Sequence, residues 1–465
     1  MSLAVESIRN ELASVVGESR VVSDVAICAG ARVDGVTPAS VVYPASSEQV
    51  AEVLKRASNC GLSVIPFRNG TKLGVGNLPR RYDLALSLKD LNRVWHYEPG
   101  DLTVTVEAGM KLGDLQHFVA RHRLWLPLDP PGGPRASLGG SLAANASGPL
   151  RLRYGTLRDM VLGMKIATTE GKLIKAGGRV VKNVAGYDLS KLLIGSYGTL
   201  GVIVEVSFKL FPVPAQSSTV VVSIATLEAA REFRRRLLDS PLTPLRLMLL
   251  NDVAGGLVCG AQAPSPPCGS EVQDAARREG VGQGFEIWIE AGGSTRVLER
   301  FKREVEQLAA STSTSVEPMD AGQAAANWAR VADWGSGLPE MAPESVVVRV
   351  QLPIAAGETF VGCALEEAGR HKIQVACFCQ AGAGVISLCL LETPGASIDL
   401  AFVGELRQIA QRLGGVLVVE RCPVELKSRL DVWGPVGDDF EITKKVKAVW
   451  DPKGVLAPGR FVGGL

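Results

Sequence analysis

The groups best able to do chemistry in this sequence are the main-chain N–H groups of three glycine-rich runs. These runs cover residues 66–76, 129–148 and 177–205. Glycine lets a backbone come close to a ligand, and exposed N–H groups in such turns make concavities that bind anions. Because the three runs fall in one part of the chain, they predict a single large cofactor that carries phosphate and is held mostly by main chain.

Each run also has a plainer interpretation. The first is not a dinucleotide fingerprint, because Gly74 and Gly76 are followed by Pro79 rather than by a third glycine and a helix. It is not a Walker loop either, because Lys72 lacks the required glycine spacing, so its alternative is an ordinary loop. The second run, rich in Ser, Ala and Gly, can place an isoalloxazine ring or a pyrophosphate against a helix start, or can serve close helix packing.

Histidine and cysteine could bind a metal, but their spacing here argues against it. His117 and His122 lie on or beside a predicted helix without other ligand types, so we expect surface or helix-end positions. Cys377 and Cys379 would share one face of a predicted strand, and with Cys389 they could form a metal or redox site. Because no CxxC pair and no histidine spacing accompanies them, we expect buried apolar cysteines.

The composition indicates a globular chain of two domains, since 465 residues exceed what one core usually supports. Basic and acidic residues nearly balance, 50 against 48, and no basic stripe with aromatic residues suggests nucleic acid. The nine cysteines form no regular framework and no signal peptide is recognised, so we expect a reducing cytoplasm. No apolar run approaches about 18 residues, so we expect membrane contact only peripherally, through a partner.

The first part of the chain reads as strands and helices that position the glycine-rich runs. Residues 41–66 predict a β-α-β unit, whose helix begins with a capping box at Ser46 and ends at Gly61. Alternating residues at 103–107 predict a half-buried strand, and Glu170-Gly171 predicts the turn of a hairpin.

Beyond residue 214, where prolines end a strand, the sequence no longer contains the glycine-rich runs and predicts a second domain. Strands and helices follow in an order that suggests an antiparallel α+β domain with helices on one face. Residues 251–284 are rich in Gly, Pro and Ser and read as a long loop. The charged helix at 231–238 is typical of a solvated face, and Trp328 and Trp334 are typical of core or interface anchors.

Taken together, the three runs resemble the flavoprotein family typified by vanillyl-alcohol oxidase and p-cresol methylhydroxylase. The resemblance implies an α+β fold, with a two-part FAD-binding domain of the p-cresol methylhydroxylase type and an α+β cap domain containing an antiparallel sheet. Residues 180–210, with the ending Pro458-Gly459-Arg460-Phe461, are similar to a narrower group, the FAD-binding E-type subunits of bacterial glycolate oxidase complexes.

The resemblance also implies where the domains begin and end. We expect an N-terminal helix and loop at 1–37, the FAD-binding domain at 38–214, the cap at 215–430, and a C-terminal segment at 431–465 that returns towards the FAD domain.

The family's cofactor positions transfer to all three runs. The first loop reads Phe-Arg-Asn-Gly-Thr-Lys and lacks the histidine that bonds covalently to flavin in some members, so non-covalent FAD is implied. The implied FAD-binding residues are Arg68, Asn69, Gly70, Thr71, Lys72, Leu73, Pro130, Ser137, Gly139, Gly140, Asn145, Gly148, Gly198, Thr199, Gly201, Val202 and Ile203.

The cap departs from the pattern of the catalytic D-type subunits in the same complexes. Those subunits carry His-Ala-Gly-Asp-Gly-Asn, and this chain has Gln380, Ala383 and Val385 at the His, Asp and Asn positions. A second motif, Glu-His-Gly, here reads Glu420-Arg421-Cys422. Hydride transfer from an α-carbon to flavin needs a base for the hydroxyl proton, and these replacements supply neither a base nor metal ligands. We therefore assign no metal and no catalytic residue.

Two further residues of the cap, His371 and Arg421, could have a structural or a functional role. His371, at a helix-to-strand connection, is expected on the surface. Arg421 could bind a substrate carboxylate bidentately, or could be a surface or interface arginine that pairs with Glu420 or Glu425.

The leading hypothesis is an FAD-binding subunit of a glycolate oxidase, in the cytoplasm or peripherally at the inner face of the membrane. A sister flavoprotein would oxidise glycolate, and an iron–sulfur partner would accept electrons, because this chain has no ferredoxin-type cysteine run. One alternative is a stand-alone FAD oxidase or dehydrogenase that uses Tyr187, Arg349 or Arg421. Another is a structural subunit without flavin.

Overall fold

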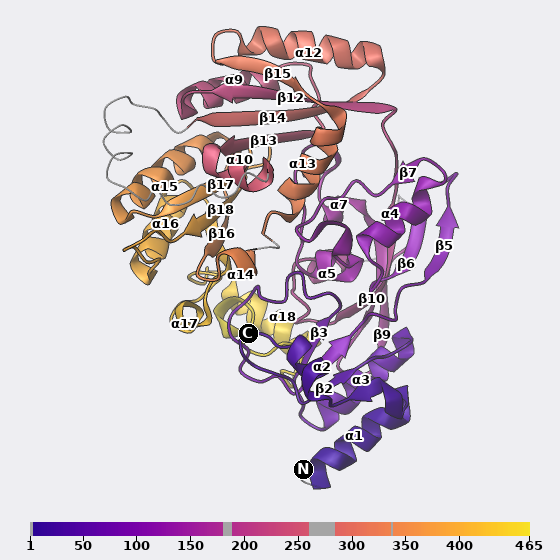
Figure 1. Ribbon diagram of the computed structural model, residues 1–465. Coiled ribbons are helices and arrows are strands. Elements are labelled where there is room, and N and C mark those ends of the chain that lie inside the picture. The colour runs from indigo at the N-terminus through magenta and orange to yellow at the C-terminus, as the bar shows by residue number, and fades with distance from the viewer. Residues whose placement is uncertain (1–2, 180–187, 260–283, 336–337) are drawn as a thin grey trace. The chain divides into compact units, whose positions relative to one another are not determined.

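The computed structural model describes residues 3–179, 188–259, 284–335 and 338–465, and its contacts divide the chain into two units (Figure 1). Unit 1 comprises Met1–Ser147, Gly155–Val213 and Asp431–Leu465, and unit 2 comprises Gly148–Tyr154 and Pro214–Leu430. The short segment 148–154 therefore belongs to unit 2, although its sequence position placed it in the predicted FAD-binding domain. No helix of the described residues is long and apolar enough to cross a membrane.

The first sheet of unit 1 has four strands in the order β1-β2-β4-β3, and β2, β4 and β3 run parallel. The predicted β-α-β unit is confirmed, because α3 connects β2 to β3. Ser46 caps this helix by accepting from the Gln49 N–H at 3.2 Å, and Gly61 follows its end with a positive φ of 67°. The bounds are β1 (Val21–Val22), β2 (Ser40–Val42), β3 (Val64–Phe67), β4 (Leu84–Ser87), α1 (Leu3–Val16), α2 (Val25–Gly30) and α3 (Ser47–Asn59).

The second sheet of unit 1 is antiparallel, with five strands in the order β5-β6-β10-β8-β9. The predicted hairpin is confirmed, with Gly171 at φ 82° in its turn between β8 and β9. The prediction of a half-buried strand at 103–107 was wrong: β6 lies between β5 and β10, and all five of its residues, on both faces of the sheet, are buried. The bounds are β5 (Val94–Glu98), β6 (Thr103–Glu107), β8 (Val161–Ala167), β9 (Leu173–Gly177) and β10 (Val202–Lys209).

Helix α3 joins the two sheets of unit 1 into one core. Its buried Val50 and Leu54 belong to the same apolar cluster as Leu86 of the first sheet and Val204 of the second. The shorter elements around this core are α4 (Leu112–Ala120), β7 (Leu124–Trp125), α5 (Leu138–Ala143), α7 (Leu157–Met160), α8 (Ser190–Leu193), β11 (Phe211–Pro212) and α18 (Phe440–Trp450).

Unit 2 is built on an antiparallel sheet of eight strands in the order β15-β12-β14-β13-β17-β18-β16-β19. This is the antiparallel sheet expected for the cap. The strands are β12 (Gln216–Ile224), β13 (Arg246–Asn251), β14 (Phe285–Gly293), β15 (Ser315–Met319), β16 (Val346–Gln351), β17 (Gln374–Gln380), β18 (Val385–Leu391) and β19 (Val416–Arg421).

The helices of unit 2 lie on both faces of this sheet, so the prediction of one covered face was wrong. On one face, Ala254 of α10 and Trp328 of α13 pack with Phe378 of β17. On the other face, α15 contacts α9, α16 and β17 (Figure 1). The bounds are α6 (Arg151–Tyr154), α9 (Leu227–Asp239), α10 (Asp252–Cys259), α12 (Thr295–Ala309), α13 (Ala321–Asp333), α14 (Leu338–Met341), α15 (Gly357–His371), α16 (Leu400–Arg412) and α17 (Val424–Lys427).

Two sequence predictions for unit 2 have mixed outcomes. The expected loop at 251–284 begins instead with helix α10, whose apolar Ala254 and Val258 are buried against the sheet, and residues 260–283 lie outside the described part. The expected buried cysteines are confirmed: Cys377 and Cys379 are 1% and 2% exposed on one face of β17. Burial raises the pKa of the Cys377 thiol to about 12, which suits an apolar residue rather than a metal ligand.

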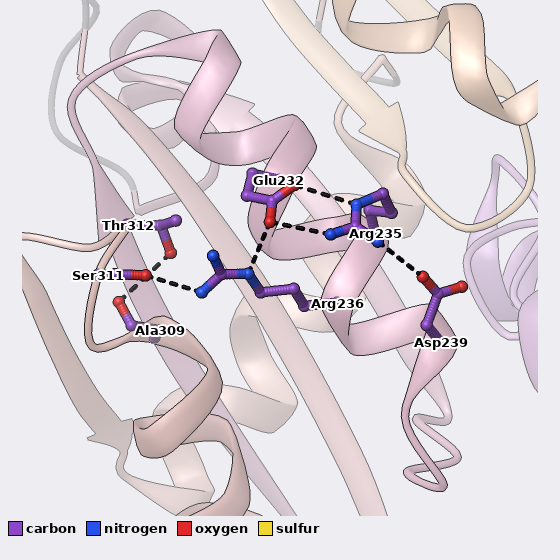
Figure 2. A network of polar contacts seen from close by, with 7 residues as sticks. All are labelled: Glu232, Arg235, Arg236, Asp239, Ala309, Ser311 and Thr312. Atoms are coloured by element: carbon purple, nitrogen blue, oxygen red, sulfur yellow. Dashed lines mark hydrogen bonds and ion pairs between the residues drawn. The ribbon is translucent and has the colours of Figure 1, made fainter.

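Helix α9 is only partly the solvated face that its charges suggested. Figure 2 shows its exposed side, where Glu232 accepts from Arg235 and from Arg236, and Arg236 reaches Ser311 at 2.7 Å. Arg234 lies on the opposite side and is buried, with Nε 2.5 Å from the buried carboxylate of Glu358. Trp328 is a core residue, 4% exposed, as one of its two expected placements requires.

Candidate functional site

The first glycine-rich run forms a loop directly after β3 with main-chain donors left over. The Leu73 N–H donates to Gly70 O at 2.9 Å and closes a turn. The N–H groups of Asn69, Gly70 and Thr71 donate to no acceptor among the described residues. Consecutive unpaired N–H groups in a turn form an anion-binding concavity, so this loop is suited to a phosphate.

A side chain ties this loop to the second run: Asn69 Nδ2 donates to Arg135 O. The neighbouring Arg68 Nε donates to Gly109 O, outside that run, at 3.1 Å. Gly132 has φ 92°, and a Cβ there would lie 2.9 Å from the side chain of Thr71. The two runs therefore approach each other closely enough that only glycine fits at this point of contact.

At the start of α5, the N–H groups of the second run are bonded within the protein, so this run offers a cofactor a surface of small side chains. The N–H groups of Leu138 and Gly139, at the start of α5, donate to Met110 O and Ala108 O, and Ser137 Oγ accepts from Gly140 N–H at 3.3 Å. A Cβ at Gly139 would lie 2.8 Å from that of Ala108, so close packing explains this glycine. Gly140 instead faces the pocket described below, where its missing side chain leaves room.

The third run reaches the pocket through a tyrosine. The N–H of Tyr197 donates to Ala143 O at 2.8 Å, which fixes this turn against α5. Gly198 follows with φ 72°, and Gly201 is packed so tightly that a Cβ would lie 2.7 Å from Ile166. Residues 202 and 203 then enter β10. Residues 180–187, which include Tyr187, lie outside the described residues.

One pocket collects these parts within unit 1. Of the sequence-predicted residues, Arg68 through Leu73, Ser137 and Gly140 line it. Pro130, Gly139, Asn145, Gly198, Gly201, Val202 and Ile203 are not among its lining residues, Thr199 lines a different pocket beside α18, and Gly148 belongs to unit 2. The lining residues that sequence reasoning missed are Ile65, Pro66, Phe67, Val75, Ala143, Ala144, Tyr197, Ala457 and Arg460.

Two of the missed residues come from the far end of the sequence. Residues 455–457 pair with β3: the Val64 N–H donates to Val455 O at 2.8 Å, and the Ala457 N–H donates to Val64 O at 2.9 Å. This pairing puts the Arg460 side chain against the first loop. The ending Pro458-Gly459-Arg460-Phe461, quoted above only for its resemblance, was the sequence signal that could have identified this contact.

Two family models match most of the chain. One, described as "FAD binding domain", matches residues 38–177, and the other, described as "FAD linked oxidases, C-terminal domain", matches residues 213–421. The chain belongs to the FAD-linked oxidoreductase family. Its cofactor is therefore FAD, and the fold-class prediction is confirmed.

Two relatives and one solved structure show what this FAD-linked oxidoreductase is similar to. The glycolate oxidase subunit GlcD of Bacillus subtilis is 26% identical over 439 residues, which cover 91% of this chain and 89% of the relative. A D-lactate dehydrogenase of Archaeoglobus fulgidus is 28% identical over 437 residues, with 91% of each chain covered. Among solved structures, p-cresol methylhydroxylase with substrate bound matches at a TM-score of 0.74 and 17% identity, covering 99% of this chain and 97% of its own.

The described residues fit the cofactor of this FAD-linked oxidoreductase. FAD carries a pyrophosphate, and the unpaired N–H groups at residues 69–71 offer donors for it at the pocket wall. The small side chains of Ala143 and Ala144 and the absent one of Gly140 leave flat surface beside these donors. The FAD roles of the individual residues stay predictions.

In unit 2, residues 380–385 stand at the position of the histidine motif. They form a turn between β17 and β18 but carry none of its ionisable side chains. Gln380 ends β17, and its side-chain oxygen is buried without a hydrogen-bond partner among the described residues. Ala383 and Val385 follow with apolar side chains. An amide does not accept a proton at ordinary pH, so this segment offers no general base.

The second motif position is occupied by residues engaged in structural contacts. Arg421 donates to Ser345 Oγ, to Ala342 O and, at 3.2 Å, to Pro343 O. Burial lowers the pKa of Arg421. Its partners are therefore neither of the expected glutamates, and Glu420 pairs instead with Arg349 at 2.8 Å. Neither arginine needs a substrate carboxylate to satisfy its guanidinium.

Only one group of described residues could hold a metal ion, and each of its carboxylates already meets a cationic or ring nitrogen. His371 Nε2 is 2.9 Å from Glu405 and 3.5 Å from Glu367, which also accepts from Arg370 at 2.7 Å. His371 was expected on the surface, but it is half-buried at the end of α15 because it packs against Phe402 of α16. His117 and His122 are exposed, as expected.

Proposed function

We propose that this FAD-linked oxidoreductase is the FAD-binding, E-type subunit of a multi-subunit oxidase that acts on glycolate or a similar 2-hydroxy acid. In this proposal a sister flavoprotein oxidises the substrate to its 2-oxo acid, glyoxylate in the case of glycolate. The present chain holds a second, non-covalent FAD that relays electrons. An iron–sulfur subunit accepts them and passes them towards quinone, and the assembly is cytoplasmic, with membrane contact only through its partners.

The substrate class is supported by the relatives. One is named a glycolate oxidase subunit, and others are named D-lactate dehydrogenase and D-2-hydroxyglutarate dehydrogenase. All three names refer to 2-hydroxy acids or to an enzyme complex that oxidises one. A chain that aligns with them over nine-tenths of its length fits the same reaction class, as a catalyst or as a companion.

The single observation that carries the companion role is the loss of acid–base groups in unit 2. When FAD is bound, it can accept a hydride from an α-carbon, but the hydroxyl proton needs a base within hydrogen-bond reach. Gln380 and Val385 cannot take that proton, and Arg421 is held by Ser345 and by two carbonyl oxygens. A flavin without its own base is suited to receive electrons from another flavin rather than from substrate.

The test is an anaerobic visible spectrum of the purified chain before and after addition of glycolate, with D-lactate as a second substrate. We expect a yellow protein whose flavin bands stay oxidised with both acids and bleach on addition of dithionite. Dithionite serves as the control, because it shows that the bound flavin can be reduced. Bleaching by either acid would mean a complete catalytic site in this chain and would overturn the companion role.

A further inference from the structure

We propose that Arg460 is a positioning residue for FAD: it holds the first glycine-rich loop in the shape that presents three main-chain N–H groups to the pyrophosphate. This inference deepens the proposed function and rests on FAD binding. The argument concerns only unit 1, in which both the loop and residues 431–465 lie.

Arg460 is buried, and one terminal nitrogen of its guanidinium donates to the loop twice. It is 6% exposed, and its Nη2 donates to Leu73 O at 2.5 Å and to Val75 O at 2.6 Å. A buried guanidinium that bonds neutral carbonyl groups makes strong, charge-assisted hydrogen bonds. Burial lowers the pKa of Arg460, and the nearby carboxylate of Asp34 opposes that effect.

The main chain at Arg460 is also fixed from two sides. Its carbonyl oxygen accepts from the Asn77 N–H at 3.1 Å and from Trp433 Nε1 at 2.9 Å. Gly76 has φ 114°, and a Cβ there would lie 2.7 Å from this oxygen. The loop therefore ends at Gly76, in close contact with the backbone of Arg460. The side chain of the same arginine bonds the loop at Leu73 and Val75.

The held carbonyl groups belong to the turn that exposes the donors. The N–H of Leu73 bonds Gly70 O, and the carbonyl of Leu73 bonds Arg460. Residues 69–71, whose N–H groups are unpaired among the described residues, are the preceding part of the same turn. Arg460 also lines the pocket, but the two hydrogen bonds of its side chain go to carbonyl groups of this loop, so we infer that it acts by holding the loop.

A second basic residue fixes the third glycine-rich run in the same manner. Lys447 Nζ donates to Thr199 O at 2.7 Å, to Leu456 O at 3.0 Å and to Asp451 at 2.6 Å. The segment 431–465 thus satisfies carbonyl groups of two runs that are more than 100 residues apart in sequence.

The test compares affinities for FAD and for riboflavin, which has no phosphate, in full-length Arg460→Gln, Arg460→Lys and wild-type chains freed of flavin. Fluorescence titration gives both dissociation constants. We expect Arg460→Gln to weaken FAD at least tenfold and riboflavin less than threefold, because only FAD uses the pyrophosphate donors. Arg460→Lys keeps a cation and is expected to recover part of the loss.

The matched control is Arg234→Gln, which removes another buried arginine, but in unit 2. It should lower thermal stability while the ratio of the two affinities stays at the wild-type value. Should Arg460→Gln not fold, Arg460→Lys and Trp433→Phe carry the test, since each weakens one contact to the loop or to Arg460. A wild-type ratio in every folded variant would overturn the positioning role. A wild-type chain that binds no FAD would instead overturn the proposed function.

Discussion

At the scale of single residues, the glycines that survive in the altered cap motif have a structural reason to survive. Gly384 lies in the turn between β17 and β18 with φ 64°, and a Cβ there would lie 2.1 Å from Leu352 O. A Cβ at Gly382 would lie 2.6 Å from the side chain of Leu152. The turn demands glycine at 384, where the clash is with backbone at a positive φ, whereas at 382 the Cβ would meet only the end of a leucine side chain. The glycine at 384 therefore has a structural reason to be present whatever the neighbouring side chains do.

This distinction predicts a difference between two glycines with similar backbone angles. Gly384→Ala should destabilise the chain by about 1–3 kcal/mol from backbone strain alone, and by more because of the clash with Leu352 O. Gly395 has φ 83° with nothing within 4 Å of a Cβ, so Gly395→Ala is the matched control for strain without a clash. Urea unfolding measures both, and equal losses would mean that the clash relaxes at no cost.

At the scale of elements, helix α9 is linked to α15 by a buried ion pair, in addition to its buried apolar side chains. Arg234 and Glu358 of α15 make two hydrogen bonds, at 2.5 and 3.1 Å, with side chains 7% and 4% exposed. The REFRRRLL sequence did not distinguish this arginine from its neighbours, because three consecutive arginines have the same charge and only the helix phase decides which one is buried.

Removing one partner of this pair should cost much more than removing both. Arg234→Met leaves the Glu358 carboxylate buried without its cation and should lower the free energy of unfolding by about 3–5 kcal/mol. The double variant Arg234→Met/Glu358→Met buries apolar groups instead and should lie closer to wild type than the single variant. Thermal and urea unfolding of the full chain give the comparison. A double variant as unstable as the sum of both single losses would contradict the explanation.

On the exposed side of α9, the contribution of Glu232 to the stability of the fold should depend on pH. Arg235 and Arg236 lower the pKa of Glu232 to about 2 (Figure 2), below its ordinary value of about 4.3. Because the folded pKa is the lower one, the ionised carboxylate stabilises the fold above about pH 4.3, and the effect is lost as the pH falls towards 2. Comparison of melting temperatures of wild type and Glu232→Gln should show a small difference at pH 7 that shrinks by pH 3 and in high salt. A difference that does not change with pH would mean that the carboxylate charge plays no part.

The elements also show which structural features could be predicted from local sequence patterns. The helix between β2 and β3 carries local signals, a capping serine and a terminal glycine, and was predicted correctly from them. The alternating pattern at 103–107 gave a wrong prediction, because the polar Thr105 is also buried, and there it forms a hydrogen bond with Ser207 of β10 at 2.8 Å. That partner is about a hundred residues away, so no local periodicity encodes it. Arg460 was missed as a pocket residue for the same reason.

At the scale of the whole molecule, one unit is made of chain segments that flank the other in sequence. Deletion of residues 431–465 removes Arg460, Lys447 and the strand-like pairing with Val64 from unit 1. We expect a truncated chain that no longer retains FAD through gel filtration while unit 2 keeps its eight-stranded sheet. Flavin absorbance per chain, with limited proteolysis to recover an intact 214–430 fragment, measures both effects. Full retention of flavin would show that the first two segments of unit 1 suffice.

The same pairing between residues 455–457 and β3 has a consequence for biosynthesis. Translation produces residues 1–213 first, but their edge strand and loop must wait for partners that emerge only after all of unit 2 has been made. Unit 2 is by then a continuous stretch free to fold, whereas the flavin pocket is still incomplete. We therefore expect cofactor loading to come at the end of synthesis, and a chain released by a ribosome that stalls within unit 2 to hold no flavin.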